Sequence, residues 1–477
     1  MSQSVLPVSI LPSSSNGTQP PEPTQGWKRS LVHFPFSLKR PQKKALRKLW
    51  AFLDDSEPFF LLGGYAGTGK STIIFAAIRE LIDRGKRVVL TAPTNKAVAI
   101  LKKMAAENEM LGIPCQTIHQ LLGLGVRNQG TEKILVQTAA SSVHLYDFIF
   151  LDECSMVGAE LWEWLERCCE KSPLANRKLV LMGDPAQLNP VGEKRSPTFN
   201  IKNRTILTEV VRQAGESPLL DFVTASRHAV KSKTDCFFPF PCYQPNDKSN
   251  GAFRASEAKL LQYGIKKVRR KFGQNPDCFR ILCYTNKRVE YYNAAIHSAI
   301  YGQDAPQFVI GERLITKNPV VAPDGKTIIL PTSCEIEVQE IAENRHYGYR
   351  VWQLRVVTDE GLVRQIFVLH ESERRRYEAE LEQKYQSAKR NSFLWRKYYW
   401  FRDDVFAKVW NCFALTVHNS QGSTFDEGAI DGDDLLVRLF VGNDESERQK
   451  RKEYNRLWYV GASRFRHRVL FLSKHKS

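Results

Sequence analysis

The stretch PFFLLGGYAGTGKSTIIFAAIREL, residues 58–81, decides the fold of this 477-residue chain. A short apolar run, FFLL, precedes a glycine-rich turn, and the turn leads into apolar residues at helical spacing. The turn has the pattern GxxxxGKS, from Gly64 to Ser71. A preceding strand and a following helix are the context in which this pattern binds phosphate. The stretch therefore predicts a strand, a phosphate-binding loop and a helix of a parallel α/β sheet.

The chemistry of the loop follows from its residue types. Glycines allow backbone N–H groups to surround phosphates at the positive end of the following helix. Lys70 can reach the β and γ phosphates, and the Ser71 hydroxyl can ligate Mg²⁺. We therefore expect ATP and Mg²⁺ as cofactors. The expected ATP contacts in the loop are Gly64, Ala66, Gly67, Thr68, Gly69, Lys70, Ser71 and Thr72.

Two further apolar strands end in polar residues that suit phosphoryl transfer. FIFLDE, residues 148–153, ends in Asp152 and Glu153. A phosphoryl-transfer site needs a carboxylate near Mg²⁺ and a group that orients the attacking water. We expect Asp152 to ligate the metal and Glu153 to orient the water. KLVLMGD, residues 178–184, continues to Gln187, and Asp184 and Gln187 are placed to sense the γ phosphate.

The rest of the chain predicts two α/β domains and two insertions. A helix is expected over residues 36–53, and the Pro-rich segment 236–251 is expected to bridge the domains. Runs on both sides of Gly130 predict a β-hairpin at about 121–143. Alternating strands over 311–369 predict a small antiparallel barrel, and the charged stretch 371–405 predicts a helix or helical hairpin projecting from it.

Composition places the chain among soluble globular proteins. The apolar fraction is 42% and the charged fraction 25%, and no stretch approaches the ~18 apolar residues of a membrane span. The first residues lack the pattern of a secretory signal, so we expect an intracellular, cytoplasmic protein. Ten cysteines without paired metal-ligand spacing are expected to be free thiols. A net charge of +18 favours a polyanionic partner such as nucleic acid.

A family resemblance appears once the motifs are read in order. From residue 64 to 465 they resemble the successive motifs of the superfamily 1 helicases: GYAGTGKS, TAPTNKAVAIL, QTIHQLLG, LDECSM, GDPAQLNPVGE, LTEVVRQ, YTNKRV, TVHNSQGSTFD and YVGASRF. The TAPTN form and the inserted module are similar to the RecD/Dda-like branch, superfamily 1B. The family usually has a second proline where this chain has Asn189 in QLNPVGE.

The resemblance implies two RecA-like domains, with an SH3-like barrel and helical tower inserted in the second. The implied division is a disordered tail at 1–26, the first domain at 27–205, the start of the second at 206–307, the barrel and tower at 308–410, and the remainder of the second at 411–477.

The resemblance also implies roles for residues far from the phosphate loop. Gln42 matches the glutamine that recognises adenine. Arg212 matches the γ-phosphate arginine, and Arg464 matches the arginine finger. Gln421 and Gly422 match the motif that couples the nucleotide state to the nucleic-acid track. Cations from a second domain would stabilise the charge of the transition state at an interdomain ATP site.

The implied track residues come from both domains. Those of the first domain are Pro93, Thr94, Asn95, Lys96, Thr117 and His119, and those of the second are Thr416 and His418. A packed core histidine is an equal alternative for His119. Stacking of bases is a possible role for Pro93 and for the aromatic cluster Trp395, Tyr398, Tyr399, Trp400 and Phe401. For that cluster, packing of the tower against the barrel is the favoured alternative.

The expected function is an ATP-dependent DNA helicase, with a role in replication, repair or recombination. The resemblance alone implies 5′ to 3′ movement on single-stranded DNA. The expected partners are single-stranded DNA and its junctions with duplex, with a single-strand binding protein or replication and repair proteins as further candidates, and the protein is expected to act as a monomer without a membrane partner. Two alternatives remain open: an RNA helicase of the same superfamily, and a nucleic-acid-stimulated ATPase clamp that does not move.

Overall fold

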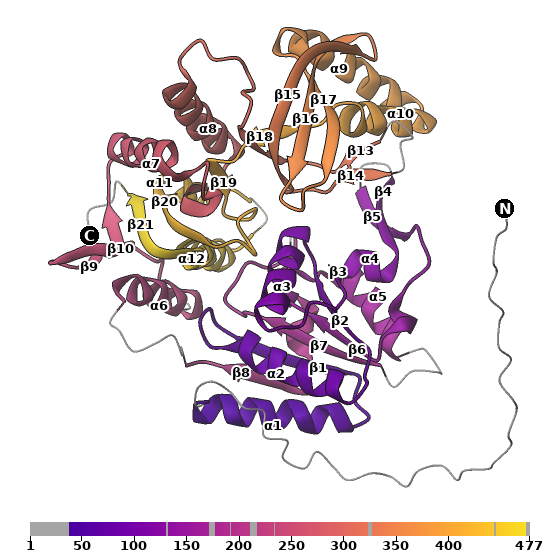
Figure 1. Ribbon diagram of the computed structural model, residues 1–477, viewed down its shortest axis with the longest axis vertical. Helices are drawn as coiled ribbons and strands as arrows, with labels where there is room; N and C mark the ends of the chain where they lie inside the picture. Colours follow the sequence, from indigo (N-terminus) through magenta and orange to yellow (C-terminus); the bar gives the residue numbers. More distant parts are fainter. Residues whose placement is uncertain are drawn as a thin grey trace, which may run out of the picture.

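The computed structural model describes residues 38–129, 132–170, 177–190, 192–209, 217–232, 234–322, 327–442 and 445–473. Two mainly parallel sheets lie next to each other, and an antiparallel sheet with its own helices lies at one end of the molecule (Figure 1). The expected disordered tail at 1–26 and the predicted arginine Arg212 lie outside the described residues.

The first sheet has six parallel strands in the order β3-β2-β6-β7-β1-β8. Its strands are apolar because helices cover both faces: one face packs against α1, α2 and α3, and the other against α4 and α5. The strands are β1 (Phe59–Gly64), β2 (Val88–Ala92), β3 (Cys115–Thr117), β6 (Phe148–Leu151), β7 (Lys178–Gly183) and β8 (Arg204–Leu207). The helices are α1 (Arg40–Asp54), α2 (Lys70–Asp83), α3 (Asn95–Glu107), α4 (Ile118–Leu122) and α5 (Ala159–Glu170).

The second sheet also has six strands, in the order β19-β11-β20-β21-β10-β9. All pair in parallel except β9, which is antiparallel to β10 at the edge. The strands are β9 (Cys242–Gln244), β10 (Asp247–Arg254), β11 (Phe279–Cys283), β19 (Ala414–Thr416), β20 (Phe425–Asp431) and β21 (Phe465–Leu472). The helices are α6 (Pro218–Lys231), α7 (Glu257–Lys271), α8 (Asn286–Tyr301), α11 (Gly432–Leu435) and α12 (Glu447–Ser463).

A five-stranded antiparallel sheet, in the order β17-β16-β15-β12-β18, interrupts the second domain between α8 and β19. Its strands are β12 (Arg313–Thr316), β15 (Glu335–His346), β16 (Tyr349–Thr358), β17 (Val363–Leu369) and β18 (Val409–Asn411). A small ladder pairs β13 (Val320–Val321) with β14 (Ile328–Leu330). The charged stretch forms α9 (Arg374–Arg390) and α10 (Trp395–Tyr399), followed by a π-helical turn at Trp400–Asp404.

A two-stranded hairpin leaves the first domain directly after α4. Its strands are β4 (Leu124–Gln129) and β5 (Glu132–Gln137), which pair antiparallel from Leu124 opposite Gln137 to Gln129 opposite Glu132. The hairpin therefore falls within the predicted range of 121–143.

Two predicted boundaries differ from the structure. The Pro-rich segment 236–251 was expected to bridge the domains, but its second half contributes β9 and β10 to the second sheet. Gly251, the last residue of this segment, has a φ of 132° and lies at an irregularity in the β9–β10 pairing. The first sheet also extends to Leu207, two residues beyond the expected domain end, because β8 pairs with β1.

One buried carboxylate ties the two domains and the insertion together. Glu335 begins β15 and is bonded to Lys96 of the first domain at 2.9 Å and to Arg280 of β11 at 3.2 Å. Arg313 of β12 lies 3.8 Å away. Burial alone would raise the pKa of Glu335, but these cations outweigh burial and hold the pKa at about 2.

Replacement of Glu335 by glutamine is expected to destabilise the protein at neutral pH. A pKa held at about 2 instead of 4.5 corresponds to roughly 3 kcal/mol of stabilisation. Because the pKa is depressed, this stabilisation is complete above pH 4.5 and is lost as the pH falls toward 2. Denaturant unfolding at pH 7 and at pH 3 measures it. The exposed interdomain pair Lys102–Glu360 supplies the control Glu360→Gln, for which less than about 1 kcal/mol is expected. Equal losses for the two variants would contradict the central role of Glu335.

Candidate nucleotide site and nucleic-acid track

The phosphate loop connects β1 to α2 in the expected manner. Gly67 and Gly69 have φ values of 77° and 80°, which glycine adopts without strain. A Cβ atom at Gly64 would lie 2.7 Å from the Thr68 hydroxyl, so the close turn also requires glycine there. The Lys70 ammonium donates to the carbonyl oxygens of Gly64 at 2.5 Å and Tyr65 at 3.1 Å. The Lys70 ammonium is thus bonded to the first two residues of the phosphate loop. Ser71 and Thr72 follow Lys70 in the first turn of α2.

Gln42 reaches the same loop from α1. Its side chain is buried, and its amide nitrogen lies 3.4 Å from the carbonyl oxygen of Thr68. The amide also occupies the space that a Cβ atom at Gly69 would need. The structure therefore places the predicted adenine-recognising residue directly against the phosphate loop.

Three carboxylates converge on this loop from the ends of β6 and β7. Asp152 accepts from the Glu153 backbone N–H at 2.8 Å. Burial raises the pKa of Asp152 and of Asp184. Burial and the neighbouring Asp152 raise the pKa of Glu153 to about 7, against the opposing charges of Arg464 and Lys70. Glu153 has a φ of 52°, a left-handed conformation that costs a non-glycine residue about 1 kcal/mol or more.

Such strain at a half-buried carboxylate suits a residue that must point at a reacting group. Glu153→Gln is expected to retain Mg·ATP binding and to slow turnover at least ~100-fold, the usual loss when a general base is removed. Single-turnover hydrolysis and nucleotide titration measure the two effects. The exposed Glu163 of α5 supplies the control Glu163→Gln. Loss of nucleotide binding by Glu153→Gln would instead make this residue a ligand.

Two side chains of the GDPAQLNPVGE motif, Gln187 and Asn189, form hydrogen bonds that fix the loop after β7. Gln187 is buried and lies 3.4 Å from the Ser155 hydroxyl, so it is fixed beside the turn that follows Glu153. Asn189, where the family usually has proline, donates to the carbonyl oxygen of Lys194 at 2.8 Å. The asparagine therefore closes this turn with a hydrogen bond, which explains how the chain accommodates the departure from the motif.

The second domain presents Arg464 to the same site. Arg464 is 7% exposed, and it lowers the pKa values of Glu153 and Asp184 by its charge. Its guanidinium donates to the carbonyl oxygens of Val460 at 3.2 Å and Ser423 at 3.4 Å. The cation is thus close to the carboxylates while still bonded within its own domain.

The predicted coupling motif lies at the contact between the domains. Gln421 is buried, and its amide nitrogen has no hydrogen-bond partner within the described part of the chain. Gly422 has a φ of 73°, and a Cβ atom there would lie 3.3 Å from that of Ala97 at the start of α3. The motif therefore abuts the helix that carries the first domain's track residues.

Sequence reasoning missed Tyr459, which makes the most direct contact between the second domain and the phosphate loop. Its hydroxyl donates to Asp184 at 2.5 Å and accepts from the Ala66 N–H at 3.1 Å. Tyr65 of the loop is likewise packed between two cations of α6, Arg227 and Lys231, at 4.5 and 4.6 Å from the ring centroid. The signal was available in part, because Tyr459 begins the YVGASRF motif.

The predicted track threonines lie where parallel strands end. Thr94 and Thr117 follow the neighbouring strands β2 and β3, and Thr416 ends β19. The hydroxyls of Thr94 and Thr117 each accept from a backbone N–H in the first turn of the next helix, which fixes the loops that present them. The Lys96 ammonium is bonded to Glu335. Pro93 and Asn95 flank Thr94 in the same strand-to-helix turn.

Both predicted track histidines are half-buried. Burial lowers the pKa of His119 and of His418, so both are neutral near pH 7 and able to donate one N–H and accept at the other nitrogen. His418 lies 6.2 Å from the ring of Tyr284.

A second Thr-Asn-Lys sequence was overlooked as a set of candidate residues. Residues 94–96 and 285–287 both read Thr-Asn-Lys, and both stand at a strand-to-helix turn in which the threonine caps the helix. Asp434 accepts from the Thr285 N–H at 2.8 Å and from its hydroxyl at 2.7 Å. The repeated tripeptide therefore marks equivalent positions in the two sheets.

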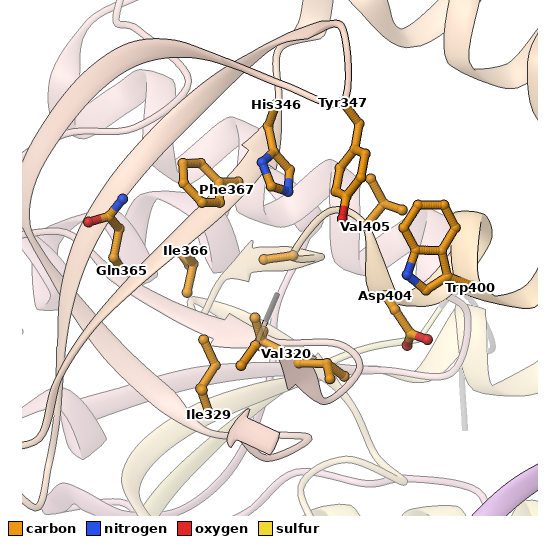
Figure 2. A pocket seen from close by; sticks show the side chains of 13 residues that line it. Val320, Ile329, His346, Tyr347, Gln365, Ile366, Phe367, Trp400, Asp404 and Val405 are labelled. Atoms are coloured by element: carbon orange, nitrogen blue, oxygen red, sulfur yellow. The ribbon is translucent and has the colours of Figure 1, made fainter. Parts of the chain in front are cut away.

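The aromatic cluster of the insertion mainly packs within it. Trp395 and Tyr399 stack at 5.5 Å, Tyr398 lies 5.6 Å from Trp395, and Phe401 is 4% exposed. Trp400 differs, because it lines a cavity of about 220 Å³ between the antiparallel sheet and the π-helical turn. Its ring centroid lies 5.1 Å from that of Tyr347 in an edge-to-face contact. Figure 2 shows these two rings side by side in the wall of the cavity.

Comparison with known proteins identifies relatives of the chain. Residues 37–233 match the family model of an AAA domain. The chain is 24% identical over 478 residues to the ATP-dependent DNA helicase dda of Enterobacteria phage T4, covering 91% of this chain and 99% of the relative. It is 24% identical over 318 residues to a protein of Acanthamoeba polyphaga mimivirus, covering 59% and 61% of the two chains. The ATP-dependent RecD2 DNA helicase of Deinococcus radiodurans is 33% identical over 168 residues, or 34% of this chain and 20% of that protein. The chain therefore spans about three fifths of the mimivirus relative and a fifth of RecD2.

Proposed function

We propose, from the membership of this chain in the RecD/Dda-like branch of the superfamily 1 helicases, that it is an ATP-driven motor on single-stranded DNA that unwinds duplex DNA. The DNA substrate is proposed from the similarity of the chain to the T4 dda and RecD2 DNA helicases. The direction, 5′ to 3′, is proposed from the resemblance of the motifs.

The contact of Tyr459 with the phosphate loop is the observation that carries this proposal. A side chain of the second domain bonds both to Asp184 and to the backbone of the loop that receives phosphate. A change in the occupancy of the loop therefore acts directly on the relative position of the two domains. Coupling of nucleotide state to domain movement is what a motor requires.

We assign the chemistry of the nucleotide site to groups that meet there. Lys70 and the loop N–H groups bind the phosphates, Glu153 orients the attacking water, and Arg464 compensates the developing charge. For Arg212, which lies outside the described residues, a role in compensating this charge is proposed from the resemblance alone. The buried carboxylate of Asp152 and the hydroxyl of Ser71 are oxygen donors of the kind that Mg²⁺ prefers. Mg²⁺ would neutralise phosphate charge when bound there.

We further propose the division of the chain that the motifs imply. The first RecA-like domain covers 27–207, allowing for the end of β8. The antiparallel sheet with α9 and α10, predicted at 308–410 and extended by one residue to the end of β18 at Asn411, is proposed to be an SH3-like barrel with a helical tower. The ends of β2, β3 and β19, together with the equivalent turn at 285–287, are proposed to hold the DNA backbone by sequence-independent contacts.

Strand displacement with three substrates tests the function. Duplexes with a 5′ DNA tail, a 3′ DNA tail or a 5′ RNA tail are offered with Mg·ATP, and strand-stimulated ATP hydrolysis is measured alongside. We expect unwinding from the 5′ DNA tail only. Equal use of the RNA tail would favour an RNA helicase. Strand-stimulated hydrolysis with no displacement of strand or of a bound block would favour a clamp.

The hairpin β4–β5 is expected to act as a wedge at the duplex junction, because it is rooted directly after α4, next to Thr117 and His119. Replacing residues 125–136 with a short Gly/Ser turn is expected to lower unwinding per ATP at least several-fold. Strand-stimulated hydrolysis and translocation are expected to remain, since no track or nucleotide residue is removed. The alternative is a surface hairpin that has no role in unwinding. Unchanged unwinding per ATP by the shortened protein would favour this alternative.

A further inference from the structure

One arginine at the domain interface is buried without an anionic partner. Arg456 of α12 is 4% exposed, and its Nη2 lies 3.4 Å from the carbonyl oxygen of Pro185. Its Nε and Nη1 have no hydrogen-bond partner in the described part of the chain, and Arg456 forms no ion pair there. A buried guanidinium with unused donors is unfavourable unless an anion completes it.

Three more cations lie near Arg456 or near its neighbour Lys452. Arg448, Lys452 and Arg456 are spaced four residues apart on α12, so they share one face of the helix. Arg195 of the first domain lies close enough to act on both Lys452 and Arg456. Burial and these three arginines lower the pKa of Lys452, and burial lowers the pKa of Arg456 to about 10.

The acidic groups near these cations are already engaged. Glu453 is bonded to Arg438 at 2.6 Å. Asp184 accepts from the Tyr459 hydroxyl and from the Ala186 N–H. Glu453 and Asp184 offset part of the charge of Arg456, but neither forms an ion pair with any of the four cations in the described residues, so the group would attract an anion with several oxygens.

The position of these four cations beside the nucleotide site indicates which anion they would bind. Pro185, which Arg456 contacts, directly follows Asp184, and Tyr459 lies one helical turn beyond Arg456. Arg456 is therefore adjacent to the side of the nucleotide site where Asp184 is placed. Arg456 is the buried member of the group. The other three cations, Lys452, Arg448 and Arg195, are exposed to solvent.

We propose that Arg456, Lys452, Arg448 and Arg195 form a second phosphate-binding site, which takes the inorganic phosphate produced at the nucleotide site as it leaves toward solvent. The proposal rests on the proposed ATP hydrolysis for the origin of the phosphate. Because Arg195 belongs to the first domain and the other three cations to the second, the site is complete only while the domains hold this arrangement. Binding of the product would therefore favour the closed arrangement until the phosphate departs.

Phosphate binding to the full-length protein tests the site directly. Inorganic phosphate is titrated into the ADP-bound protein by calorimetry, and its inhibition of steady-state hydrolysis is measured in parallel. The double variant Arg448→Gln/Lys452→Gln removes the two exposed cations of α12 without touching the buried one. We expect both phosphate constants to weaken about 10-fold or more, because bonds to charged groups are among the stronger ones. The control Lys259→Gln/Lys266→Gln removes the same charge from exposed positions of α7 and is expected to change neither constant.

Three outcomes would overturn the assignment. Unchanged phosphate constants in the double variant would remove the site. An equal fall in the single-turnover rate of ATP cleavage would show that the cations act on the transition state instead. A DNA backbone phosphate as the ligand would appear as a lower salt dependence of single-strand binding, by about one unit of slope for each cation lost. Calorimetry detects phosphate binding without ATP hydrolysis, so it tests the site independently of the proposed function. If the protein bound phosphate through Lys452 but did not cleave ATP, the proposed function would be refuted and the phosphate site would remain.

Discussion

Lys70→Ala is expected to abolish ATP hydrolysis while the protein remains folded. The Lys70 ammonium is held within 3.1 Å of two loop carbonyl oxygens, Gly64 and Tyr65, which is the position from which it can turn to the phosphates. Alanine leaves the loop glycines and the helix N-terminus in place but removes the cation that binds the β and γ phosphates. Steady-state hydrolysis with a saturating single strand measures the loss, and thermal unfolding measures the fold.

The matched control for Lys70 is Lys86→Ala, an exposed lysine between α2 and β2. This variant is expected to hydrolyse ATP at the parent rate. If Lys70→Ala retained near-parental hydrolysis, the phosphate loop would not be the site of the reaction, and the roles given to Glu153 and Arg464 would fail with it.

Arg464→Ala is expected to lower turnover by about 10³-fold or more with ATP affinity largely retained. An arginine supplied by a second domain acts mainly on the charge that develops in the transition state, so its removal affects kcat more than binding. In the structure its guanidinium bonds the carbonyl oxygens of Val460 and Ser423 and the hydroxyl of Ser463, all in its own domain. Single-turnover cleavage and nucleotide titration separate the two effects.

Arg466→Ala is the control for Arg464, because Arg466 stands two residues further along, is exposed and pairs with Asp426. It is expected to leave turnover unchanged. Normal turnover by Arg464→Ala would mean that another cation serves the transition state, and Arg212 would then be the first residue to test.

Much of the first domain could be predicted from the sequence because its signals are local. The phosphate loop, the strand that ends in Asp152 and Glu153, and the strand before Asp184 each occupy fewer than ten consecutive residues, and the structure has the strands at those positions. Short apolar runs predict buried parallel strands because both faces of such a sheet are covered. The hairpin and the alternating strands of the insertion were predicted for the same reason, since their period of two is visible residue by residue.

The segment 236–251 was misjudged because prolines and polar residues are also compatible with a short edge strand. Pairing with β21, more than 200 residues later in the chain, places β10 and its partner β9 in the second sheet. The domain boundary moved to Leu207 for a similar reason, because β8 is defined by its pairing with β1.

The sequence by itself determined which residue types stand around the phosphate loop and in what order the motifs follow. Tertiary structure decided which side chains from the second domain reach that loop. Ala66 and Tyr459 are separated by 393 positions, and no local spacing predicts that the hydroxyl of one meets the N–H of the other. The same holds for Glu335, which joins cations from three parts of the chain, and for Arg195 beside α12. Local motifs depend on backbone geometry over a few residues, whereas these contacts depend on how the two sheets pack against each other, and that packing is not encoded at any single stretch of the chain.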